Sequence, residues 1–66
     1  MQEVLERLKV ERKLTQDLLN SCEERRDRTP RGSASWRCLD AEAQFYKGEV
    51  KGLNTAIKAI EREAQK

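Results

Sequence analysis

Residues 36–64 read WRCLDAEAQFYKGEVKGLNTAIKAIEREA and carry the strongest pattern in the chain. Apolar residues recur there at alternating spacings of three and four, which is the heptad pattern of a helix that packs along a neighbouring helix. This large-residue row consists of Trp36, Leu39, Ala43, Tyr46, Val50, Leu53, Ile57, Ile60 and Ala64. The unbroken register predicts one helix over residues 35–65.

A second row on the same predicted helix has the same spacing but lies about 130° around it, at 100° per residue. This small-residue row consists of Cys38, Ala41, Phe45, Gly48, Gly52, Thr55 and Ala59. Each Gly inside a helix costs about 1 kcal/mol relative to Ala unless close packing offsets it. We therefore expect the large-residue row to contact a helix of the same chain and the small-residue row to contact a second chain. The alternative is that both glycines face solvent.

Residues 2–27 are rich in Leu, Glu, Lys and Arg and contain neither Gly nor Pro, so they predict a second helix. Its apolar stripe comprises Val4, Leu8, Thr15, Leu18, Leu19 and Cys22, with Met1 and Leu5 at its edge and Glu11 and Arg12 as its polar middle. Val10 and Leu14 lie to one side, beyond the reach of a two-helix contact. The expected seam inside the chain joins Val4, Leu8, Leu18 and Leu19 to the large-residue row.

The connection over residues 28–34 contains Pro30 and Gly32, which are typical of a turn. Ser33 or Ser35 can cap the helix that follows, and we favour Ser35. A connection this short makes its two helices antiparallel neighbours. The chain is thus predicted to be all-α, with residues 1–66 forming one antiparallel αα-hairpin that dimerises into a four-helix bundle, or forms a higher oligomer.

Composition excludes several functional classes. The 66 residues contain no His and two Cys, so the usual four-ligand zinc sites and a His general base are absent from one chain. Two helices also offer little concavity in which to shift pKa values, so we expect neither an enzyme nor a cofactor. The longest apolar runs are too short for a membrane span or a signal peptide. We expect a mature cytoplasmic protein without membrane contact.

The turn carries the one local excess of positive charge, with five Arg and one Asp between residues 25 and 37. The structural interpretation, which we favour, is that arginines at a helix C-terminus offset the helix dipole and pair with nearby Glu. The functional interpretation is an anion or partner site, where Trp36 stacks on a base and the arginines hold phosphate. RNA, DNA or a nucleotide are its candidate ligands. Its residues are Arg25, Arg28, Arg31, Ser33, Ser35, Trp36 and Arg37.

Cys22 and Cys38 are equally distant from Pro30 in the sequence, so antiparallel helices bring them to a similar height. Two buried thiols are the favoured interpretation, because nothing else indicates an oxidising compartment. A disulfide within the hairpin and an intermolecular bridge through Cys38 are the alternatives.

The predicted function is binding without catalysis. We expect an oligomeric hairpin that acts on another protein as a regulator, adaptor or inhibitor, through Val10 and Leu14 or through the Arg-rich turn. Regulatory proteins of phages and mobile elements are analogous in size and shape. The two alternatives are nucleic-acid or nucleotide binding at the turn, and a structural coiled-coil piece of a longer protein.

Overall fold

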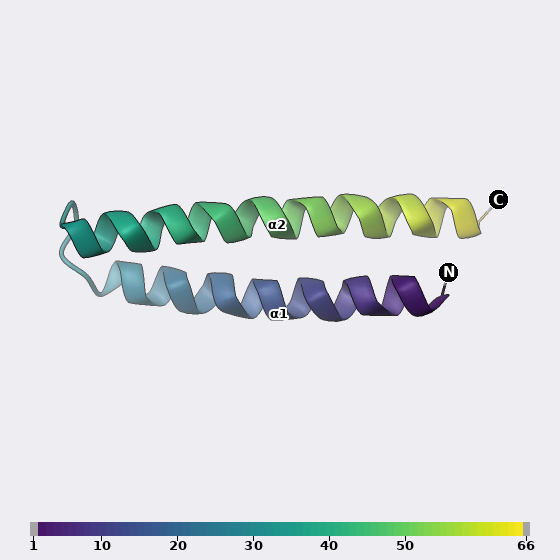
Figure 1. Ribbon diagram of the computed structural model, residues 1–66, viewed down its shortest axis with the longest axis horizontal. Coiled ribbons are helices and arrows are strands. Elements are labelled where there is room, and N and C mark those ends of the chain that lie inside the picture. Colours follow the sequence, from purple (N-terminus) through teal and green to yellow (C-terminus); the bar gives the residue numbers. More distant parts are fainter. Residues whose placement is uncertain (1, 66) are drawn as a thin grey trace.

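A computed structural model describes residues 2–65, and Met1 and Lys66 lie outside the described residues. Helix α1 spans Gln2–Asp27 and helix α2 spans Ala34–Ala64. The two helices run antiparallel, side by side, in a rod 50 Å long and 14 by 12 Å across (Figure 1). The predicted all-α class and the packing of two helices against each other as a hairpin are confirmed.

The turn between the helices is built from short-range hydrogen bonds. The Thr29 hydroxyl donates to the Arg25 carbonyl at 2.7 Å and ends α1. Gly32 takes a φ of +85°, in the left-handed region that favours glycine. Ser33 is the N-cap of α2, because its hydroxyl accepts the Trp36 N–H at 3.2 Å. The preference for Ser35 as the cap was therefore wrong, and α2 begins one residue earlier than predicted.

The seam between the helices contains the large-residue row of α2. Ala43 and Ile57 are 0% and 1% exposed, and the rest of the row is half-buried, except that Ala64 is exposed. Leu19 and Cys22 of α1 pack with Ala43 at the centre of the core, which Leu39 and Tyr46 extend. On α1 the seam follows its own heptad of buried and half-buried residues, namely Leu5, Leu8, Arg12, Thr15, Leu19, Cys22 and Arg26.

Val4 and Leu18 were expected in the seam but are 48% and 52% exposed. Each precedes a buried leucine by one residue, and one residue turns the side chain by about 100° around the helix. The seam is centred on Leu5 and Leu19, and Arg12 occupies its polar middle. Arg12 fits there because its Nη1 donates to Asn54 Oδ1 at 2.9 Å.

One side of the seam, here called the ionic flank, is crossed by charged pairs. Lys9 lies 3.6 Å from Glu61, and Lys47 lies 3.8 Å from Glu23. Near the turn, Arg26 Nη1 donates to Asp40 Oδ1 at 2.9 Å. The two exposed lysine pairs contribute up to about 1 kcal/mol each, so they fix the helix register more than they stabilise it. The Arg26–Asp40 pair is half-buried. The opposite side, the open flank, holds Glu11 and Thr15 of α1 beside Glu49 of α2.

Candidate functional site

The first candidate surface is the side of α2 that faces away from α1. All seven residues of the small-residue row lie there exposed, and Phe45 is 63% exposed. The Phe45 ring meets the Tyr46 ring edge-on, with 5.8 Å between centroids. A Cβ added at Gly48 or Gly52 would meet no atom within 4 Å. The hairpin itself therefore gives no reason for glycine at either position.

The exposed area of the chain is large for its mass. It amounts to 5243 Å², about 900 Å² more than the roughly 4,300 Å² typical of a folded monomer of 7.7 kDa. An elongated two-helix rod accounts for this excess. A standard protein interface covers about 800 Å² on each partner, so the excess is of the size that one partner covers.

The second candidate surface is the outside of α1. Val10 and Leu14 are each 59% exposed, outside the seam as expected. They line a hollow of about 290 Å³ together with Lys9, Lys13 and Asp17. Lys13 and Asp17 pair with each other across one turn at 3.6 Å. This hollow is thus an apolar floor with a charged rim, which is the usual anatomy of a protein-binding patch.

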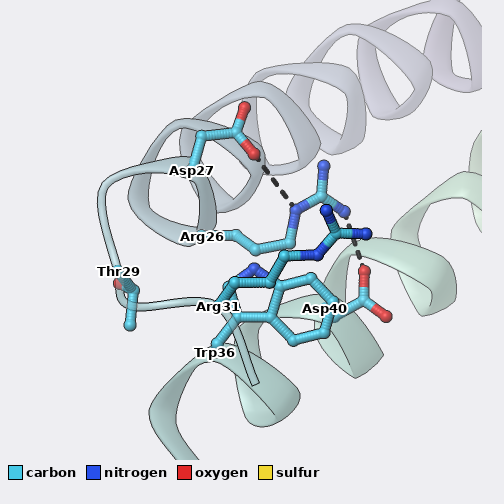
Figure 2. Close-up of a pocket in the computed structure, with 6 residues that line it drawn as sticks. All are labelled: Arg26, Asp27, Thr29, Arg31, Trp36 and Asp40. Carbon is cyan, nitrogen blue, oxygen red and sulfur yellow. Dashed lines mark hydrogen bonds and ion pairs between the residues drawn. The ribbon is translucent and has the colours of Figure 1, made fainter. Parts of the chain in front are cut away.

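The third candidate surface is an open pocket of about 440 Å³ at the turn (Figure 2), lined by Arg26, Asp27, Thr29, Arg31, Trp36 and Asp40. Figure 2 shows Arg26 held by both carboxylates, and Arg31 extending from the turn toward the Arg26–Asp40 pair. The bond to Asp40 raises the pKa of Arg26, and the Asp27 contact adds to this while desolvation opposes it. Two arginines and two carboxylates balance the charge of this pocket.

The residues of the predicted anion site are only partly brought together. Arg31 and Trp36 line the pocket, whereas Arg25, Arg28, Ser35 and Arg37 are exposed outside it. The Ser33 hydroxyl already makes two hydrogen bonds within the chain, since it donates to the Pro30 carbonyl at 2.7 Å and accepts from the Trp36 N–H. Arg28 pairs with Glu24 at 3.8 Å, as the structural interpretation of the arginines expects.

Both cysteines are free. Cys22 is buried, and its thiol donates to the Leu39 carbonyl at 3.1 Å. Burial, with smaller contributions from the hydrogen bond to Glu42 and its charge, raises the pKa of Cys22. Cys38 is exposed on the small-residue row, so the expectation of two buried thiols holds for Cys22 and was wrong for Cys38.

The sequence interpretation missed the part that Arg26 and Asp40 play at the turn. Arg26 was grouped with the arginines that end α1, but it lies in the seam, seven residues after Leu19. That spacing continues the α1 heptad, so the signal was present in the sequence. Asp40 directly follows Leu39 of the large-residue row and so lies beside the seam, within reach of a cation on α1.

Among residues 2–65, no group of His, Cys, Asp or Glu is arranged to hold a metal ion. Neither helix contains, within the described residues, a segment long and apolar enough to cross a lipid bilayer. Comparison with protein-family models, with curated proteins and with solved structures finds no match.

Proposed function

We propose that this chain is a binding protein without catalytic activity, which self-associates through the outer side of α2 and engages another protein through the outer side of α1. The observation that carries the proposal is the exposure of large apolar side chains on both outer sides, with Phe45 on α2 and Val10 and Leu14 on α1. Exposed apolar patches on small proteins mark interaction sites. As a regulator, adaptor or inhibitor, such a hairpin acts by occupying a surface of its partner.

The two helices are assigned different binding roles because their outer side chains differ in size. The α2 surface is nearly flat apart from Phe45, and glycines allow a second helix to approach closely. The α1 surface instead presents two large apolar side chains, Val10 and Leu14, in an open depression bordered by charged residues. Each surface is therefore suited to a different kind of neighbour.

Self-association is tested by sedimentation equilibrium at micromolar concentration, with Phe45→Glu and Leu14→Glu as a matched pair. Both substitutions put a carboxylate on an exposed apolar position, and Phe45→Glu also removes the ring contact to Tyr46. We expect a dimer or higher oligomer that Phe45→Glu converts to monomer and Leu14→Glu leaves intact. A monomeric wild-type chain would overturn this part of the proposal.

Engagement of another protein is tested by capture from an extract of the source cells with the same two variants. We expect the wild type to capture the partner and Leu14→Glu to fail to capture it. Circular dichroism confirms that each variant is still helical. Identical captures by the wild type and Leu14→Glu would remove the α1 surface from the proposal.

A second candidate function, binding of RNA, DNA or a nucleotide, is favoured by Arg31 and Trp36 lining one pocket. Two nearby carboxylates weigh against it, so it stands second. Its test is quenching of Trp36 fluorescence by single-stranded RNA, because Trp36 is the one tryptophan in the chain. Quenching that is lost between about 50 and 200 mM salt, and lost in Arg31→Ala, would support it.

A further inference from the structure

We propose that two copies of this chain pair in parallel and in register along the outer side of α2, so that both turns lie at the same end of the dimer. This inference rests on the self-association proposed above and specifies its geometry. The evidence is the pattern of charge on either side of Phe45 and the glycines. A second copy of the same chain is the occupant that this pattern fits.

Two columns of charge border the small-residue row, each repeating every seven residues. One column precedes Cys38, Phe45, Gly52 and Ala59 by one residue and is basic or neutral, consisting of Arg37, Gln44, Lys51 and Lys58. The other follows Ala41, Gly48, Thr55 and Arg62 by one residue and is acidic or neutral, consisting of Glu42, Glu49, Ala56 and Glu63. The charges are therefore sorted by sign across the exposed row.

These columns occupy the positions that flank the core of a two-stranded coiled coil. When Phe45 and Gly48 are taken as core positions a and d, the basic column falls at g and the acidic column at e. These positions set the orientation of paired helices, because their side chains meet across the interface. Arg37, Lys51, Lys58 and Glu49 make no ion pair within residues 2–65, so the hairpin does not use their charges. Glu42 makes no ion pair there either, and its Oε2 accepts from the Cys22 thiol at 3.7 Å.

Orientation follows from which columns meet. In a parallel pair, each g residue faces the e residue five positions later on the second copy, so Arg37 meets Glu42, the neutral Gln44 meets Glu49, and no like charges meet. In an antiparallel pair, g faces g and e faces e, which would set Lys51 against lysine and Glu49 against glutamate. Like charges across an interface are unfavourable, so complementarity selects the parallel pair.

The parallel register also assigns a position to Cys38. As an a residue it lies opposite Cys38 of the second copy, whereas an antiparallel pair centred on the two glycines would place it opposite residue 62. Cys38 is exposed and unbridged, and Cys22 is buried in the seam. Cys38 is therefore a natural reporter of orientation.

A parallel pair has a consequence for the turn. It gathers Arg25, Arg28 and Arg31 of both copies at one end of the dimer, where like charges are screened over about 10 Å at 0.1 M salt. The α1 helices lie on the outer sides of such a dimer, because the small-residue row points away from the seam. Val10 and Leu14 thus remain accessible in both copies.

The deciding experiment is disulfide mapping of the full chain in a glutathione redox buffer, with the variant Arg62→Cys beside the wild type. The wild type is expected to form a covalent dimer through Cys38. Arg62→Cys is expected to give the 38–38 and 62–62 bridges, identified by peptide mass. Phe45→Glu keeps Cys38 exposed but lacks the association, so its bridging is expected to be at least about tenfold slower.

Each outcome of this mapping has a distinct meaning. A 38–62 bridge between copies would show an antiparallel pair and overturn this inference while leaving the proposed self-association in place. An oligomer in which neither cysteine bridges would mean that another face associates, which also overturns it. A wild-type chain that sediments as a monomer would overturn both proposals together.

Charge substitutions at Gln44 give an independent test of orientation. Gln44 is exposed and lies outside the seam, so its substitution leaves the hairpin unchanged. In the parallel pair Gln44→Lys gains two ion pairs with Glu49, one on each side of the interface, and is expected to lower the dimer Kd about threefold. Gln44→Glu places like charges there and is expected to raise the dimer Kd by a similar factor. In an antiparallel pair Gln44 would face Lys51 and Lys58 of the second copy, and the two effects would be reversed.

Discussion

The two rows of α2 share one spacing but differ in composition and in surroundings. The large-residue row faces α1 and contains the most buried side chains of that helix, Ala43 and Ile57. The small-residue row faces away from α1, and every member is exposed. The same heptad spacing thus occurs on a buried side and on an exposed side of one helix, so spacing alone does not tell which side is covered.

The largest effect is expected from Ile57→Ala, which truncates the most buried large side chain. Loss of a buried isoleucine of this kind destabilises a protein by about 2–5 kcal/mol. We expect loss of most helical circular dichroism at 25 °C, because small domains have little stability in reserve. Phe45→Ala is the control on the small-residue row, and in dilute solution its urea midpoint should stay close to that of the wild type.

Enlarging an alanine gives the converse comparison. Ala43 is 0% exposed, so Ala43→Leu overpacks the seam against Leu19 and Cys22 and should destabilise the hairpin by about 1–3 kcal/mol. Ala59→Leu places the same side chain on the exposed row and should change hairpin stability by less than about 0.5 kcal/mol. Urea unfolding of both variants measures the difference. Equal destabilisation would mean that the small-residue row is covered within the hairpin.

The sequence predicted the two helices and their seam well because heptad spacing is a local property of each helix. It misplaced Val4 and Leu18 because α1 has polar residues at the middle of its stripe. With Arg12 counted as polar, the apolar centre of α1 shifts by one residue, which moves a side chain from the seam to the flank. The packing of Leu19 and Cys22 on Ala43 and the cross-helix bond from Arg12 to Asn54 fix the true centre.

The candidate site was less predictable than the fold. Arg31 and Trp36 of the predicted site line one pocket, but the carboxylates beside them come from different helices. Asp27 ends α1 and Asp40 lies in the second turn of α2, and a sequence pattern does not fix their distance to one arginine. Ser33 was assigned to ligand binding, yet capping of α2 already uses its hydroxyl. The geometry of the turn decides which side chains meet there, and sequence spacing does not describe that geometry.

Gly52→Ala is expected to have a smaller effect, with opposite signs for the stability of the hairpin and the affinity of the dimer. Gly52→Ala adds a Cβ that meets nothing within the chain, so it should stabilise the hairpin by about 0.5–1 kcal/mol through helix propensity. The same Cβ would stand between paired α2 helices, so the dimer should weaken. Unfolding in dilute solution and sedimentation at high concentration should therefore shift in opposite directions. A more stable hairpin together with a tighter dimer would show that no close helix contact forms at Gly52.

The smallest effect concerns the two thiols, Cys22 in the seam and Cys38 on the exposed row. Burial raises the pKa of Cys22 above its ordinary value of 9.0, so on alkalinisation the unfolded chain loses this proton first. The stability from the neutral thiol is therefore fully present below pH 9 and is lost as the pH rises through the folded-state pKa. Cys22→Ser, which does not titrate there, should show a shallower fall in urea midpoint between pH 8 and about 10.5. Cys38→Ser should show the same fall in urea midpoint with pH as the wild type, because Cys38 is exposed and its replacement leaves the surroundings of Cys22 unchanged. A shallower fall in Cys38→Ser than in Cys22→Ser would contradict the burial assigned to the two thiols.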